Sequence, residues 1–209
     1  MLYPKLLLCL GAAALLLAQT RNLGVFTDNG PVGDNPVAGK VVYDAAKAEY
    51  RITDGGANVW DRTDAFHFVW KTLTGDVTLG ADIEWVGSSP TAHRKAMLMI
   101  RQSLDPDSAY ADAVSHGDGL TALQFRGAKG ENTYETFTNI EGPIRLRIVR
   151  KGSRFTMLAG KPNGKLETVG PVDIIRLQGP VYVGLGVCSH VADRLETAVF
   201  TNVTLEPAK

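Results

Sequence analysis

The chain has 209 residues, and its 22 Lys and Arg balance its 22 Asp and Glu to a formal net charge of zero. A protein that binds nucleic acid through the phosphates carries a basic excess, so we predict no nucleic-acid partner. Hydrophobic residues make up 44% of the chain, which argues against a disordered acidic chain. The length suits one large domain that buries its own core.

The chain begins with the pattern of a secretory signal peptide. Lys5 precedes the apolar run Leu6–Ala18, which is shorter than the roughly 20 residues of a membrane-spanning helix. We therefore predict that Met1–Ala18 is a cleaved signal peptide and that the protein is secreted or periplasmic, without a stable membrane span; an uncleaved anchor is the alternative. Cleavage leaves 21 basic and 22 acidic residues, a net charge of −1, and removes Cys9. Cys188 then has no partner for an intramolecular disulfide, and its apolar surroundings predict a small buried side chain.

The rest of the chain shows the two-residue alternation and β-branched content of strands, with Gly, Pro, Asn and Asp in the gaps. No stretch keeps the 3.6-residue period of a helix. We predict a loose N-terminal segment over residues 19–39 and a single β-sandwich domain over residues 40–209. The expected strands cover residues 48–53, 65–73, 75–87, 94–103, 109–116, 120–127, 134–140, 143–152, 154–160, 165–170, 172–177, 181–190 and 196–207.

So many strands without helices predict an all-β fold made of two packed antiparallel sheets or a closed barrel. The length of the strands favours the sandwich with large, curved sheets. No internal repeat and no linker divides the chain.

The order of several motifs resembles the jelly-roll domains of the concanavalin A-like lectin/glucanase superfamily, in particular secreted bacterial domains of unassigned function, some attached to Tol-type propeller proteins. The segments that carry the resemblance are residues 55–70 (GGANVWDRTDAFHFVW), 75–83 (GDVTLGADI), 95–111 (KAMLMIRQSLDPDSAYA), 145–157 (RLRIVRKGSRFTM), 181–190 (VYVGLGVCSH) and 197–203 (TAVFTNV). The resemblance implies a two-sheet antiparallel jelly roll that holds sugars on its concave face. A Trp that many relatives carry after the fourth segment is absent here, so no role of it transfers.

Alternation along the expected strands separates apolar rows from rows of mixed polarity. If the mixed rows meet on one concave face, they form a groove in which planar groups stack on sugar rings and polar groups bind hydroxyls. A plain solvated face is the alternative. The candidate ligand-binding residues are His67, Arg101, Asp112, His116, Gln124, Arg126 and His190.

The hypothesis for function is an exported carbohydrate-binding module whose partner is a carbohydrate or small polar ligand. A glycan-active hydrolase or lyase of the same fold, using His67 or His116 with Asp112, is one alternative. A protein-interaction domain of the cell envelope is another. Glucanases of this fold carry E-x-D-x-x-E, whereas Asp82-Ile83-Glu84 lacks the third acid and lies opposite an apolar row. Catalysis is therefore not the favoured interpretation.

We predict no cofactor and no metal ligands, because no two histidines have a metal-ligand spacing. Calcium held by Asp105 and Asp107 is an alternative to an ordinary Asp-Pro turn. Trp60 follows two glycines and either stacks on a ligand or packs at the edge of the sandwich.

Overall fold

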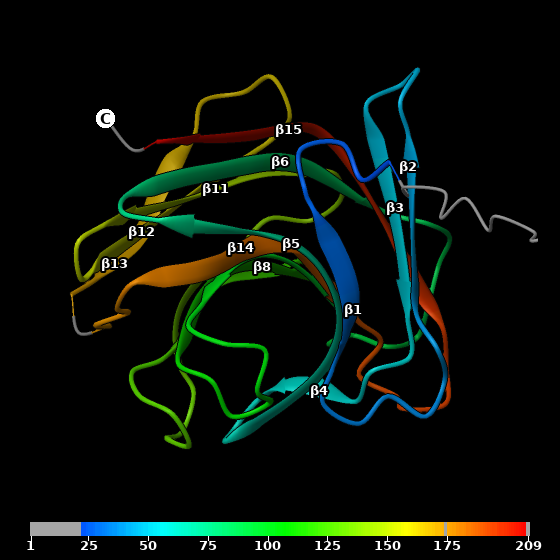
Figure 1. The fold of residues 1–209 in the computed structure, drawn as a ribbon. Helices are drawn as coiled ribbons and strands as arrows, with labels where there is room; N and C mark the ends of the chain where they lie inside the picture. The colour runs from blue at the N-terminus through cyan, green and yellow to red at the C-terminus, as the bar shows by residue number, and fades with distance from the viewer. Residues whose placement is uncertain (1–21, 174, 208–209) are drawn as a thin grey trace, which may run out of the picture.

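The computed structural model describes residues 22–173 and 175–207. They form two antiparallel sheets that pack face to face, which confirms the predicted all-β sandwich (Figure 1). The predicted signal peptide lies outside the described residues. Residues 22–173 and 175–207 contain no helix that could span a membrane.

The larger sheet, sheet A, has β10 at one edge and β1 at the other, with the short β4 paired to β5 alone. It curves strongly, and in Figure 1 β5 follows an arc that starts near β4. Its strands, in spatial order, are β1 (Asp28–Val32), β5 (Thr63–Thr74), β14 (Pro180–Cys188), β7 (Lys95–Arg101), β8 (Tyr110–His116), β9 (Leu120–Arg126) and β10 (Tyr134–Asn139), with β4 (Asn58–Trp60) beside β5.

The smaller sheet, sheet B, covers the convex side of sheet A. Its strands, in spatial order, are β13 (Glu167–Val172), β12 (Arg154–Gly160), β11 (Ile144–Lys151), β6 (Val77–Trp85), β15 (Glu196–Pro207), β3 (Glu49–Asp54) and β2 (Lys40–Asp44). Strand β11 shows why the sheet forms: Ile144, Leu146 and Ile148 are buried in the core, while Arg145 and Arg147 alternate with them on the outer face.

Residues 22–39, which we expected to be a loose segment, are an ordered part of the sandwich. Leu23 and Phe26 belong to the main core, and β1 pairs with β5. The sequence hides this strand because it contains Asn29-Gly30-Pro31, residues typical of turns. An edge strand tolerates Pro because one side of it needs no ladder hydrogen bond.

The strand expected over residues 172–177 does not form beyond Val172, where β13 ends. Ile175 and Leu177 are instead buried in the core from an irregular segment. Because the two residues are two positions apart, both side chains reach the core without a regular strand. The carbonyl oxygen of Leu177 accepts a hydrogen bond from the Arg150 guanidinium at 2.8 Å. The Arg150 side chain thus takes the place of a neighbouring strand as the hydrogen-bond partner of this carbonyl.

The concave face of sheet A carries a second apolar cluster, separate from the core between the sheets. We call it the concave cluster. It consists of Val32, Val59, Phe66, Phe68, Trp70, Met97, Met99, Tyr110, Val114, Ala122 and Cys188. The predicted burial of Cys188 is confirmed. Gly186 is needed here, because a Cβ at this position would lie 2.9 Å from the Phe66 ring. The concave face is thus largely filled by the protein itself.

Candidate functional site: a histidine pocket on the concave face

Antiparallel register places the mixed rows of three strands across one another on the concave face. At one end of the face, Lys95 of β7 lies opposite His116 of β8. At the other end, Arg101 lies opposite Tyr110, and Tyr110 lies opposite Arg126 of β9. The two ends have different surroundings.

One end is a closed ionic cluster, the arginine cluster, made of Asp64, Arg101 and Arg126. All three side chains are fully buried. Arg126 donates two hydrogen bonds to the Asp64 carboxylate, at 2.8 and 3.0 Å, and Arg101 Nη2 donates a third at 3.4 Å. Backbone carbonyls, including those of Ser103 and Ser108, accept further guanidinium hydrogen bonds. Each buried charge has a partner, so this cluster is part of the protein's framework.

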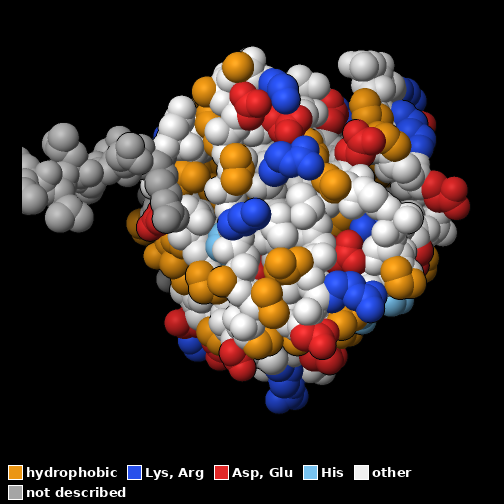
Figure 2. Space-filling view, turned by 90° about the vertical axis from the view of Figure 1, so that its right-hand side faces the viewer, with side chains coloured by type: hydrophobic (Ala, Val, Ile, Leu, Met, Phe, Trp, Pro, Cys, Tyr) orange, Lys and Arg blue, Asp and Glu red, His pale blue; other side chains and the backbone are white. Residues whose placement is uncertain are grey.

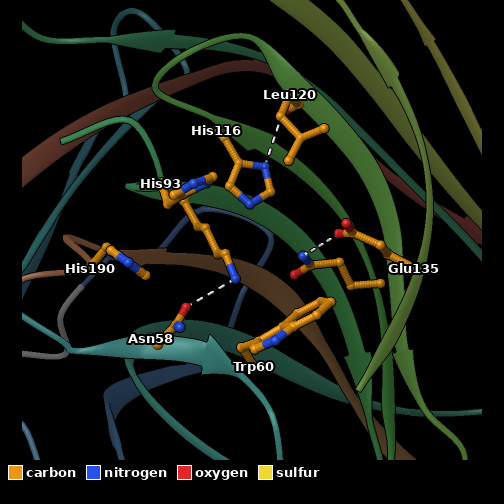
Figure 3. A pocket seen from close by; sticks show the side chains of 9 residues that line it. Asn58, Trp60, His93, His116, Leu120, Glu135 and His190 are labelled. Atoms are coloured by element: carbon orange, nitrogen blue, oxygen red, sulfur yellow. Dashed lines mark hydrogen bonds between the residues drawn. The ribbon is translucent and has the colours of Figure 1, made fainter. Parts of the chain in front are cut away.

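The other end is an open pocket of about 200 Å³, which we call the histidine pocket (Figure 3). Its lining combines one indole ring, three imidazoles, an ammonium, two amides and one carboxylate. The lining residues are Asn58, Trp60, His93, Lys95, His116, Leu120, Gln124, Glu135 and His190.

Strand β4 forms one wall of the histidine pocket. Val59 is buried in the concave cluster, so its neighbours Asn58 and Trp60 face the other way, towards the pocket. The Lys95 amine donates hydrogen bonds to Asn58 Oδ1 at 3.0 Å and to the Val59 carbonyl at 2.7 Å. It also lies 5.3 Å from the centre of the Trp60 ring. Lys95 thereby fixes β4 over the sheet and keeps one N–H for a ligand.

Three histidines form the opposite wall, with ring centroids 5.7 Å apart for His93 and His116 and 5.5 Å apart for His93 and His190. His190 has a left-handed backbone, with φ of 65°. Such a conformation costs about 1–3 kcal/mol for a residue other than glycine. Strain of this kind is concentrated at functional sites, and here it occurs in a residue that lines the pocket.

His116 presents a hydrogen-bond acceptor to the pocket. Its Nδ1 lies 3.0 Å from the Leu120 carbonyl oxygen. Because a carbonyl can only accept, Nδ1 carries the proton and Nε2 is left as the acceptor. Burial, with a smaller effect of the Lys95 charge, lowers the pKa of His116 to about 3. The ring is therefore neutral near pH 7.

The floor of the pocket contains buried polar atoms without partners. Gln124 donates to Glu135 at 3.0 Å, but its own Oε1 has no partner among the described residues. The same is true of both carboxyl oxygens of Asp112, which lies beside Gln124 in register. Burial raises the pKa of Asp112 well above its usual value.

Six of the seven residues predicted from the sequence lie on the concave face, where they fall into three groups. His116, Gln124 and His190 line the histidine pocket, and Asp112 is buried beside Gln124. Arg101 and Arg126 are in the arginine cluster and do not line the pocket.

The expected position of His67 on the concave face is wrong. Its neighbours Phe66 and Phe68 take that face, so His67 points to the opposite side of β5. There its Nε2 lies 3.2 Å from Asn29 Oδ1 of β1. Burial lowers its pKa to about 4.

Several lining residues are not among the seven predicted from the sequence. Lys95 lies in the same row of β7 as Arg101, and Trp60, for which the sequence leaves stacking or edge packing open, lines the pocket. Glu135 lies on an edge strand, two residues from Phe137, and alternation places both on one face. His93 lies in a loop, where no period predicts direction.

The carboxylates proposed for calcium have another partner, because Asp105 and Asp107 both form ion pairs with Lys129. In the described part of the chain no three His, Cys, Asp or Glu side chains are placed to hold a metal ion. Asp82, considered for glucanase chemistry, lies on the outer face of sheet B, where it binds Arg145 at 2.9 Å and Asn202 at 2.7 Å.

Comparison with solved structures places this arrangement in a known fold. A functionally unknown protein from Saccharomyces cerevisiae aligns with a TM-score of 0.64 at 15% identity, over 81% of this chain and 92% of that one. The carbohydrate-binding module CBM66 from Bacillus subtilis aligns with a TM-score of 0.57 at 19% identity, over 87% and 97%. A family 7 alginate lyase aligns with a TM-score of 0.54 at 10% identity, over 80% and 83%.

No protein-family model matches the sequence, and no curated protein matches it. The structural matches show that the chain has the concanavalin A-like jelly-roll fold, as its motifs suggested. Among the proteins of this fold are a carbohydrate-binding module and a glycan-active enzyme.

Proposed function

We propose that this protein binds carbohydrate and holds one end of a glycan in the histidine pocket. The observation that carries the proposal is the lining itself, in which a half-buried Trp60 ring faces hydrogen-bonding groups. A sugar ring has apolar C–H faces and polar edges, so it needs a flat aromatic surface and fixed donors and acceptors around it. Lys95 and Asn58 supply donors, and His116 Nε2 and Glu135 supply acceptors.

The size of the pocket favours binding of a terminal sugar of a glycan over binding of a sugar in the middle of a long chain. Its volume of about 200 Å³ is below the roughly 300–1,000 Å³ of sites for drug-sized ligands. The concave cluster and β4 occupy much of the face on which an open groove would run. One sugar ring is therefore the unit that the pocket accommodates.

The chemistry of the lining favours binding over cleavage. Glycosidases use two carboxyl groups that flank the scissile bond, whereas Glu135 is the one carboxylate among the lining residues. A histidine with a pKa of about 3 is a weak base at neutral pH, so His116 is better suited to accept a hydrogen bond than to abstract a proton.

The surface charge is compatible with a ligand of low charge. On the face seen in Figure 2, acidic and basic side chains are interspersed with apolar groups, and neither sign dominates. We also propose that the protein acts outside the cytoplasm, because Lys5 and the apolar run after it have the pattern of a signal peptide. The N-terminal sequence of the protein recovered from its native cells tests this point, since cleavage near Ala18 is expected.

Binding to a glycan array, followed by calorimetric titration with each sugar that binds, tests the proposed function. Trp60→Ala should weaken binding at least about tenfold, because the stacking surface is lost. Val42→Ala is the matched control, since Val42 is an exposed apolar residue on β2, at the far edge of the other sheet. Release of new reducing ends or unsaturated products would show an enzyme instead, and equal affinity in the two variants would exclude the pocket.

A further inference from the structure

Strand β10 carries an exposed aromatic side chain next to the histidine pocket. Phe137 is 61% exposed. It pairs in register with Ala122 of β9. The residues two positions before and after Ala122 on the same face, Leu120 and Gln124, both line the pocket. Glu135, two positions from Phe137 on β10, lines it as well.

Phe137 therefore lies at the rim of the pocket, on the concave face, without being part of the pocket wall. Ala122, the cross-strand neighbour of Phe137 on β9, belongs to the concave cluster. The Phe137 ring therefore continues the apolar surface of that cluster towards the edge of the sheet. A phenyl ring exposed to this degree leaves apolar area in water that a ligand could cover.

The surroundings of Phe137 favour a polar, extended ligand over an apolar one. Strand β10 is the edge of sheet A, and no described strand pairs with its outer side. Backbone N–H and C=O groups on that side can bind hydroxyl groups. Beyond the strand lies a hollow of about 540 Å³ between β10 and the β12–β13 connection, lined by Phe137, Asn139, Lys161, Lys165 and Glu167, among others.

We infer that Phe137 and the edge of β10 form a second sugar subsite, which binds the residues that follow the terminal sugar of the same glycan. The inference rests on the proposed function of the histidine pocket. The terminal ring occupies the pocket between Trp60 and the histidines. The next ring stacks on Phe137, and the chain leaves towards the hollow beside β10. The site thus selects for the length of the glycan as well as for its end.

The experiment compares a monosaccharide with its disaccharide and tetrasaccharide, measured by calorimetric titration of the purified protein. Three series are titrated, built from xylose, glucose and mannuronate. Each series contains the monosaccharide and its β-1,4-linked disaccharide and tetrasaccharide. In a series that binds, the tetrasaccharide should bind more tightly than the monosaccharide. Phe137→Ala should weaken tetrasaccharide binding about three- to tenfold, the range of one aromatic contact, and leave monosaccharide binding unchanged.

Tyr134→Ala is the matched control. Tyr134 is a similarly exposed aromatic residue on the same strand, at 57%, but it pairs with Phe125 and therefore points to the opposite face. It should not change binding of either ligand. Equal tetrasaccharide affinity in wild type and Phe137→Ala, or an equal loss in Tyr134→Ala, overturns the second subsite while monosaccharide binding still supports the pocket. A protein that binds no sugar in these series and none on the glycan array overturns both proposals.

Discussion

Lys95 and Arg101 are the two ends of β7 and lie on the same face of it, yet their surroundings differ. Arg101 donates to the Asp64 carboxylate and to two backbone carbonyls in a fully buried cluster. Lys95 has no carboxylate of the described residues within hydrogen-bonding distance and shares a pocket with Trp60 and three histidines. Two basic residues on one face of the same strand can thus have different roles. Arg101 stabilises the fold at one end, and Lys95 forms part of a ligand site at the other. The difference is whether Asp64 and its neighbouring loops cover the end.

The largest effect is expected from Asp64→Asn, which breaks the covered end. The change leaves Arg101 and Arg126 buried without a counter-charge. Removing one partner of a buried ion pair costs about 3–5 kcal/mol, so the urea midpoint of the variant should fall sharply. A loss below about 1 kcal/mol would contradict the assignment of the arginine cluster to the framework. Protein that remains folded should bind sugar as the wild type does.

Lys95→Met and Arg101→Met form a matched pair on one strand. Lys95→Met removes the amine that holds Asn58 and faces the ligand, so sugar affinity should fall at least about tenfold, or about 1.4 kcal/mol. Arg101→Met should lower the free energy of unfolding by about 2–4 kcal/mol and leave the affinity of the folded protein unchanged. Calorimetric titration and urea unfolding of both variants measure the two effects. The reverse pattern would show that the ligand site lies at the arginine cluster.

Acid should destabilise the pocket end through His116. Its folded pKa, about 3, is below the ordinary value of 6.5. Between these values the unfolded chain binds a proton that the folded chain excludes, so stability falls as the pH falls from 6.5 towards 3, by at most about 1.4 kcal/mol per pH unit. His67 acts in the same direction, and Asp54, whose pKa burial raises to about 6, acts in the opposite one.

Replacing His116 isolates its contribution, because the other groups are common to both proteins. The free energy of unfolding should differ less between pH 7 and pH 5 in His116→Gln than in wild type. Urea titrations at the two pH values measure this difference. An unchanged difference would mean that the His116 ring takes up its proton in the folded state as readily as in the unfolded chain.

The smallest effect is expected on the outer face of sheet B. Asp82 is largely buried there, and its carboxylate accepts hydrogen bonds from Arg145 and Asn202. Asn at this position keeps one of the two acceptors, so Asp82→Asn should lower the free energy of unfolding by about 0.5–1.5 kcal/mol, the contribution of one hydrogen bond, and leave sugar binding intact. Loss of a glycan-related activity in this variant would restore the glucanase hypothesis for Asp82 and Glu84.

The sequence predicts the long strands and the mixed rows because alternation is a local property. It does not predict which end of a row is covered, since that depends on Asp64, which reaches Arg126 across 62 positions of sequence. It also misses β1, β2 and β4, which are too short or too rich in turn residues to show a period. The direction of His67 could have been inferred from Phe66 and Phe68, because a large apolar pair on one side places the residue between them on the other.

Strand β4 lies in the connection that carries the chain from β3 of sheet B to β5 of sheet A. The wall that holds Asn58 and Trp60 therefore belongs to the connection between the two sheets. β4 pairs with β5 alone and is not a central strand of either sheet. Natural variation or laboratory selection at Asn58 and Trp60 would remodel the ligand site while Gly56 and Val59 keep the segment packed against the sandwich. A library at these two positions, with Lys95 retained as the anchor of β4, offers a direct way to alter which sugar the scaffold holds.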